Sequence, residues 1–164
     1  KSHFFMTLNA YKKTKQYEQL TCSTVTLSSQ KILAGLKHLN RLEQVLAAQK
    51  ILNTDFTDAI MSDDSGHIIE TISKNIIFFK NNKIYSPLLS DSGVYGVALR
   101  WLESQGHKIN WKKIEFNDLS EYHGMMVCNS IQGFNSIKNI DNKIYFNKRL
   151  KIAGMIISAW NERC

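Results

Sequence analysis

The stretch "NIIFFKNNKIYS", residues 75–86, constrains the fold of this chain more than any other. It contains two apolar runs rich in isoleucine, phenylalanine and tyrosine, which are residues that favour β-strands. The runs meet at Asn81 and Asn82, and asparagine tolerates the positive φ angles that tight turns require. The stretch therefore predicts a β-hairpin, so the fold must contain paired strands.

Further strands and a second hairpin are predicted along the chain. Runs of apolar and β-branched residues predict strands at residues 4–10, 22–28, 58–63, 67–71 and 108–116. The stretch "MMVCNSI" predicts a short buried strand that leads into a loop, and "IKNIDNKIYF" predicts the second hairpin. Strands are therefore expected from one end of the chain to the other.

Three helices are interleaved with these strands. Residues 39–52 carry apolar side chains at helical spacing, namely Leu39, Leu42, Val45, Leu46 and Leu52. The stretch "SDSGVYGVALRWLESQG" predicts a helix that follows a glycine-bearing segment and ends at Gly106, and residues 148–163 predict a closing helix. This alternation predicts an α/β or α+β fold with a mixed sheet. Because no linker or repeat interrupts the chain, residues 1–164 are expected to form a single domain.

Composition narrows the classes of partner. The hydrophobic content of 43% argues against disorder, and no apolar run reaches the length of a membrane span. The net charge of +7 invites a nucleic-acid interpretation, but the lysines are dispersed and match no recognition motif. We therefore expect no nucleic acid and no membrane as partner, and small anionic ligands are favoured.

The cysteines and histidines predict no metal site. Cys22, Cys128 and Cys164 lack metal-ligand spacing, and the five histidines are scattered. An odd number of cysteines favours free thiols, which are typical of a reducing compartment. The expected localisation is therefore cytoplasmic.

Four segments carry candidate functional residues, and each has a structural alternative. Lys37 follows small residues that allow close packing, and an enclosed lysine amine is kept neutral and usable as a nucleophile and base; the alternative is a surface lysine. Glu70 ends an apolar strand, where a carboxylate needs a partner unless it reaches solvent. Residues 93–98, "GVYGVA", open a helix whose N–H groups could bind a phosphate, and residues 128–130, "CNS", end a strand with a hydroxyl. Each segment taken alone favours the structural alternative.

Taken together and in this order, the segments resemble those of the fold-type-IV pyridoxal-phosphate enzymes, the class-IV aminotransferase family. This family holds branched-chain and D-amino-acid aminotransferases and aminodeoxychorismate lyase. The stretch "GLKHLNRLEQVLA" is similar to the lysine segment of the lyase in particular, because the aminotransferases share the lysine but usually not "HLNRLEQ". "IETISKNIIFF", "YSPLLSDSGVYGVALRWL" and "MMVCNSI" match the family's later motifs, so the resemblance covers nearly the entire chain.

The resemblance implies a role for each candidate residue. Lys37 would carry pyridoxal 5'-phosphate covalently and act as the catalytic base, and Glu70 would pair with the pyridine nitrogen. Backbone N–H groups of Val97 and Ala98 would hold the phosphate, with Ser130 donating from the facing loop. The implied fold is the large domain of these enzymes, a mixed sheet partly closed into a barrel with flanking helices.

The chain also departs from the family pattern at several positions. Relatives often carry threonine where this chain has Ala98, a small residue where it has Lys74, and proline where it has Ser136. Asn75 is expected to shape its own turn rather than contact the cofactor. These departures affect details of the site more than the assignment to the family.

The lyase resemblance implies a reaction and an assembly. The substrate would be 4-amino-4-deoxychorismate and the products 4-aminobenzoate and pyruvate, in folate biosynthesis. The alternatives are an aminotransferase of the same fold and a non-enzymatic basic binding module. Relatives carry a smaller domain ahead of a segment like "HFFMTLNAY" and act as homodimers, so residues 1–164 are expected to be the C-terminal cofactor-binding domain of a longer enzyme.

Overall fold

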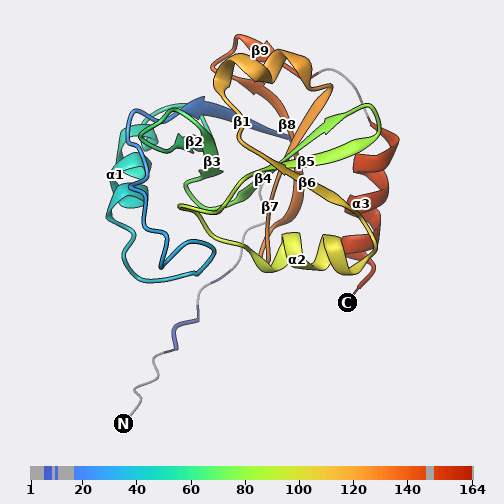
Figure 1. The fold of residues 1–164 in the computed structure, drawn as a ribbon, viewed down its shortest axis with the longest axis horizontal. Coiled ribbons are helices and arrows are strands. Elements are labelled where there is room, and N and C mark those ends of the chain that lie inside the picture. Colours follow the sequence, from blue (N-terminus) through green and yellow to red (C-terminus); the bar gives the residue numbers. More distant parts are fainter. Residues whose placement is uncertain (1–5, 9, 11–16, 147–149, 164) are drawn as a thin grey trace.

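The structure is a computed structural model that describes residues 6–8, 10, 17–146 and 150–163 (Figure 1). Its elements in chain order are β1 (Tyr17–Cys22), α1 (Leu42–Ile51), β2 (Asp58–Ser62), β3 (Ile68–Thr71), β4 (Asn75–Lys80), β5 (Lys83–Pro87), α2 (Val97–Ser104), β6 (Ile109–Lys112), the 3-10 helix η1 (Phe116–Glu121), β7 (Gly124–Asn129), β8 (Gly133–Ile140), β9 (Ile144–Tyr145) and α3 (Lys151–Asn161).

The strands form one mixed sheet in the order β3-β2-β1-β8-β7-β4-β5-β6, with β9 paired to β8. β1 runs parallel to β2 and β8, and β5 runs parallel to β6, whereas the remaining pairs are antiparallel. The two ends of the sheet approach each other, because the Ile68 N–H at β3 donates to the Ile114 carbonyl just after β6 at 2.7 Å. The expected mixed sheet, partly closed into a barrel with flanking helices, is confirmed (Figure 1).

The hairpin predicted at residues 75–86 is formed by β4 and β5. Asn81 and Asn82 have φ angles of 51° and 59°, so both turn residues occupy the left-handed region that asparagine tolerates. Asp141 and Asn142 have the same conformation between β8 and β9, which confirms the second hairpin.

The apolar residues of β4 pack on both faces of the sheet. Ile76 and Phe78 belong to a core cluster that also contains residues of β1, β2, β7 and η1, whereas Ile77 and Phe79 belong to a cluster with α2 and α3. Figure 1 shows α2 and α3 on the same side of the sheet, away from α1. Since both faces are covered, the strand can be apolar without alternation.

Several predicted boundaries are wrong. The strand expected at 22–28 is replaced by β1, which ends at Cys22, and beyond it only Leu27 forms an isolated bridge. Residues 6–8 and 10 lie in no strand, and residues 4, 5 and 9 lie outside the described residues. The strand expected to reach residue 116 ends at Lys112, because the chain then turns into η1.

The helix predicted at residues 39–52 is present as α1, but its apolar side chains do not face the core. Leu39, Leu42, Val45, Leu46 and Leu52 are all exposed, and Gln44 and Ala47 are the buried positions.

In the described part of the chain, no helix has the length and apolar character needed to cross a membrane.

Candidate functional site

A cavity of about 230 Å³ lies where four separate segments of the chain meet. These are the segment before α1, the turn between β3 and β4, the residues before α2 and the end of β7. Four of the five residues predicted to bind the cofactor line the cavity, namely Lys37, Glu70, Val97 and Ser130. The fifth, Ala98, is fully buried and does not line the cavity.

Residues 93–96 connect the lysine segment to Glu70. The Val94 N–H donates to Glu70 Oε2 at 2.9 Å. On the other side, the Gly35 N–H donates to the Gly93 carbonyl and the Tyr95 N–H donates to the Gly35 carbonyl, both at 2.9 Å. Gly35 lies two residues before Lys37, so one short loop sets the lysine segment relative to the carboxyl group.

Gly93 can be only glycine in this arrangement. Its φ is 83°, and a Cβ atom there would lie 2.6 Å from Ile69 Cγ2 and 2.8 Å from Leu89 Cδ2. A side chain would therefore be strained by the backbone and would also collide with the packed strand that carries Glu70.

Asn75 fixes the same loop from the side of β4. Its Nδ2 donates to the Val94 carbonyl at 2.6 Å, and the Gly96 N–H donates to its Oδ1 at 3.2 Å. Sequence reasoning assigns Asn75 to its own turn, whereas the structure shows its side chain reaching across to the start of α2. The contact is long-range, and the sequence offers only the fixed spacing from Glu70 as a signal.

Burial changes the acidity of Glu70. Its side chain is only 3% exposed, and this burial raises the pKa to about 7. The Val94 N–H, the cations of Arg41 and Lys37, and the amide of Gln44 act in the opposite direction and offset part of the rise. A carboxyl group with a pKa near neutrality can hold or release a proton in response to a ligand.

Lys37 lies on the open side of the cavity. The sequence predicts an enclosed lysine, but within the described residues its side chain is exposed. The cause is local, because residues 36–41 precede α1 without regular structure and are tied to the rest of the site through Gly35 and Arg41. The described part of the chain therefore encloses the carboxyl group of Glu70 but leaves the amine of Lys37 exposed.

The amino end of α2 is open to an anion. Its N-cap is Gly96, and no side chain caps the helix. The first N–H groups of a helix lack intrahelical partners and carry the positive end of its dipole. Val97, with 61% of its surface exposed, and the exposed Ser130 line the cavity beside these groups.

The cavity is also rich in cations. Lys37, Arg41 and Arg100 line it, together with Lys74, whose ammonium is paired with Asp58, against the lining carboxylate of Glu70. Sequence reasoning names Lys74 only as a departure from the family pattern, and it does not identify Arg41 or Arg100 as site residues. This balance favours an anionic ligand.

Thiol and metal chemistry are not offered by the described residues. Cys128 lines the cavity, but complete burial raises the pKa of its thiol far above neutrality. Cys22 is half-buried beside Asp141, and burial together with this neighbour raises the pKa of its thiol to about 12. No group of three or more His, Cys, Asp or Glu side chains in the described ranges could hold a metal ion. The accessible nucleophile of the site is an amine.

Known proteins resemble this chain in sequence and in fold. Residues 1–140 match the sequence model of the family described as Amino-transferase class IV. An aminodeoxychorismate lyase of Vibrio harveyi is 37% identical over an alignment of 135 residues that covers 78% of this chain and 50% of the relative. The chain thus spans about half the length of this curated relative.

Two solved structures also resemble this chain in fold. The crystal structure of 4-amino-4-deoxychorismate lyase from Pseudomonas aeruginosa has a TM-score of 0.81 and 25% identity, over 90% of this chain and 56% of that one. A branched-chain aminotransferase from the archaeon Thermoproteus uzoniensis, solved with norvaline, has a TM-score of 0.77 and 16% identity, over 90% and 51% of the two chains. At that identity, the second likeness shows the fold alone.

Proposed function

Because this chain belongs to the class-IV aminotransferase family, we propose that it is the cofactor-binding part of an aminodeoxychorismate lyase. The enzyme would convert 4-amino-4-deoxychorismate to 4-aminobenzoate and pyruvate. The observation that carries the proposal is the meeting of Lys37, Glu70 and the amino end of α2 in one cavity, joined by residues 93–96. The 37% identity to a lyase supports this choice within the family.

The residues of the cavity fit pyridoxal phosphate. The cofactor presents an aldehyde, a ring nitrogen and a phosphate, and the cavity offers an amine, a buried carboxyl group and an uncapped helix end. Lys37 would hold the aldehyde carbon, Glu70 the ring nitrogen, and the N–H groups of Val97 and Ala98, with the Ser130 hydroxyl, the phosphate. The carboxyl group, whose pKa is about 7 without a ligand, would be held ionised by a protonated ring nitrogen.

The chain's own residues would then perform the proton chemistry. Bound pyridoxal phosphate supplies an electron sink for charge that develops at the substrate carbon bearing the amine. The free amine of Lys37 takes the proton from that carbon, and Glu70 keeps the ring nitrogen protonated. The bond between the ring carbon and the enolpyruvyl oxygen would then break, the released enolpyruvate would take up a proton to become pyruvate, and the ring left behind would be aromatic, which favours the products.

An aminotransferase of the same fold is the second candidate. It would use the same lysine and carboxyl group, and the solved aminotransferase shares the fold. The two activities differ in their products, because only the lyase releases pyruvate and 4-aminobenzoate without a keto-acid acceptor. The cationic lining suits a substrate with carboxylate groups in either case.

We further propose that full activity needs a second, smaller domain and a homodimer. Two features support this: the chain spans about half of its curated relative, and Lys37 is exposed within the described residues. Folate biosynthesis in the cytoplasm is the setting proposed, which agrees with unpaired Cys22 and Cys128. Turnover measured for residues 1–164 alone should be at background and should be restored in the complete natural polypeptide; equal rates would contradict this part.

The central test is chemical. The complete polypeptide should bind pyridoxal phosphate, lose the cofactor's colour with borohydride, and carry the pyridoxyl group on Lys37 in a peptide map. It should release pyruvate and 4-aminobenzoate from 4-amino-4-deoxychorismate. A pyridoxyl group on Lys31 or Lys74 would refute the assignment of the lysine, and a requirement for a keto acid would favour the aminotransferase.

A further inference from the structure

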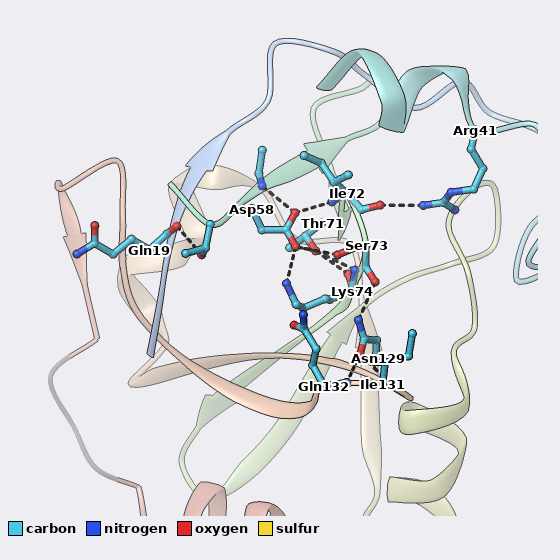
Figure 2. Close-up of polar contacts among 12 residues, drawn as sticks. Gln19, Arg41, Asp58, Thr71, Ile72, Ser73, Lys74, Asn129, Ile131 and Gln132 are labelled. Carbon is cyan, nitrogen blue, oxygen red and sulfur yellow. Dashed lines mark hydrogen bonds and ion pairs between the residues drawn. The ribbon is translucent and has the colours of Figure 1, made fainter. Parts of the chain in front are cut away.

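Asp58, at the start of β2, lies beside the turn that follows Glu70. Its side chain is 3% exposed, and each of the four residues of the turn, 71–74, donates a hydrogen bond to its carboxylate (Figure 2). Oδ1 accepts from the Ile72 N–H at 3.1 Å and from the Ala59 N–H at 2.9 Å, and Oδ2 accepts from Thr71 Oγ1 at 2.9 Å, Ser73 Oγ at 3.2 Å and Lys74 Nζ at 2.9 Å.

The outer side of the same turn is held by residues of the cavity. Arg41 Nη2 donates to the Ile72 carbonyl at 2.8 Å, and Asn129 Nδ2 donates to the Ser73 carbonyl at 3.3 Å. Figure 2 shows the two side chains reaching the turn from different directions. Arg41, Asn129, Ser73 and Lys74 all line the cavity. The turn is therefore fixed to the lysine segment on one side and to the loop of Ser130 on the other.

The position of this turn sets two residues that hold the cavity together. Glu70 precedes it and Asn75 follows it, and both bind residues 94–96 ahead of α2. A buried ion pair such as Asp58–Lys74 adds little to stability, because desolvation offsets the attraction. The pair instead helps to fix one geometry of the turn, because only that geometry lets the Asp58 carboxylate accept hydrogen bonds from all these donors.

We propose that Asp58 is a positioning residue of the cavity, which acts through the turn 71–74 to hold Glu70 and Asn75 against residues 94–96. The expected effect of Asp58 on the binding of pyridoxal phosphate rests on the function proposed above. The expected effect on residues 94–96 does not, since it concerns only contacts within the chain.

An asparagine at this position cannot replace the carboxylate. Oδ1 faces two backbone N–H groups, and Oδ2 faces the Lys74 ammonium. These are donors only, so an amide NH₂ would oppose donors in either orientation. Asp58→Asn keeps the volume of the side chain, but it removes the charge, so both the hydrogen bonds and the ion pair with Lys74 are disturbed.

Asp63 offers a matched control. It follows the other end of β2, and its Oδ1 accepts from the N–H groups of Ser65 and His67, both at 2.9 Å. Its turn lines no part of the cavity described above. The Oδ2 atom of Asp63 lies 3.1 Å from His67 Nδ1. Asp63→Asn therefore makes the same substitution at a turn-holding carboxylate outside the site.

The first measurement is amide hydrogen exchange in the cofactor-free, complete polypeptide. In Asp58→Asn, exchange at Val94 and Gly96 should accelerate at least about tenfold more than at Ile77 of β4, because only the loop is released. In Asp63→Asn, the exchange rates of the Val94, Gly96 and Ile77 amides should all change by the same factor. A uniform change in Asp58→Asn would overturn the proposal, since a merely structural role loosens all amides alike.

The second measurement is a titration with pyridoxal phosphate. Asp58→Asn should bind at least about tenfold more weakly than Asp63→Asn, as found when outer partners of a site are removed. At saturation its visible circular dichroism per bound cofactor should be smaller, because the ring is held less firmly. Equal affinity and equal dichroism would overturn the link to the cofactor. Failure of the unsubstituted protein to bind pyridoxal phosphate would instead refute the proposed function, and exchange would still decide the role of Asp58.

If Asp58→Asn does not fold, Lys74→Met serves in its place. This change removes the ion pair and keeps an apolar side chain of similar length. It should give the same selective acceleration at Val94 and Gly96, smaller in size, and uniform exchange there would equally overturn the proposal.

Discussion

The two helices that flank the cavity are held in place by different forces. α2 buries Ala98, Leu99 and Leu102 in a core cluster with α3 and β4. α1 buries Gln44 and Ala47, and its Leu42, Val45 and Leu46 side chains are exposed. The helix beside the proposed phosphate site is thus anchored by three buried apolar side chains, whereas the helix beside Lys37 contributes only Ala47 to a buried apolar cluster.

Polar contacts hold the α1 side instead. Arg41 donates to the Ile72 carbonyl, the Ser28 N–H donates to Glu43 Oε1 at 3.1 Å, and Lys50 Nζ donates to Thr24 Oγ1 at 2.6 Å. Such contacts each contribute less than burial of a leucine. The lysine side of the site therefore has the weaker internal support, and its exposed apolar surface is available to the further domain or partner subunit proposed above.

The largest expected effect separates the two helices directly. Leu102→Ala in α2 should lower the free energy of unfolding by about 2–5 kcal/mol, because the fully buried side chain leaves a cavity. Leu42→Ala in α1, where the side chain is 64% exposed, should lower it by less than about 0.5 kcal/mol. Urea unfolding of residues 1–164 measures both. Equal losses would show that α1 is packed as tightly as α2.

Glu70, between the two sides, gives a pH-dependent effect. Its pKa in the folded protein, about 7, lies above its ordinary value of 4.5, so the folded state binds the proton more tightly than the unfolded state. The stability due to the protonated carboxyl group is complete below pH 4.5 and is lost as the pH rises through 7. Relative to Glu70→Gln, the cofactor-free protein should lose about 3 kcal/mol across this window.

Unfolding curves at a series of pH values check this expectation. A difference between the two proteins that is constant with pH would contradict the raised pKa. In the complete, cofactor-loaded enzyme, Glu70→Gln should retain colour but turn over roughly 10²-fold more slowly, because an amide cannot hold the ring nitrogen protonated. Full activity of this variant would refute the role of Glu70.

A third effect concerns the hydrogen bonds by which Asn75 holds residues 94–96 at the start of α2. A Cβ atom at Gly96 would lie 2.3 Å from Asn75 Oδ1, so Gly96→Ala must displace Asn75 from its contacts with residues 94–96. We expect a loss of about 1–3 kcal/mol in unfolding free energy and weaker binding of pyridoxal phosphate. Gly154→Ala in α3 is the control, since nothing lies within 4 Å of the added atom, and it should stabilise the protein by about 0.5–1 kcal/mol. Unchanged cofactor affinity in Gly96→Ala would contradict the role given to Asn75.

The smallest effect tests the polar attachment of α1. Arg41→Met removes the hydrogen bond to the Ile72 carbonyl and a cation that lowers the pKa of Glu70. It should lower the unfolding free energy by about 1 kcal/mol and raise the pKa of Glu70 further. Lys50→Met, at the exposed far end of α1, should change stability by less than about 0.5 kcal/mol and leave Glu70 unaffected. Carbon NMR of the Glu70 carboxyl group during a pH titration distinguishes the two variants. An equal pKa of Glu70 in both variants would contradict the proposed effect of Arg41 on this carboxyl group.

Local features of the fold could be predicted from the sequence. The hairpin at Asn81 and Asn82, the three helices and the glycine stop at Gly106 depend on residues close together in the chain, whose backbone preferences act without long-range help. Motif order, set beside the family, also indicated Lys37, Glu70, Val97 and Ser130, all of which line the cavity.

Tertiary structure alone decided the rest. The apolar spacing of α1 determined that a helix forms, but not that Gln44 and Ala47 would face the core, because the direction a helix turns depends on what packs against it. The contacts of Asp58 with residues 71–74, and of Asn75 with residues 94–96, join segments many residues apart. Burial of Glu70, which raises its pKa, is likewise a property of the assembled strands. Sequence determined which groups the site contains, and packing determined their distances and proton affinities.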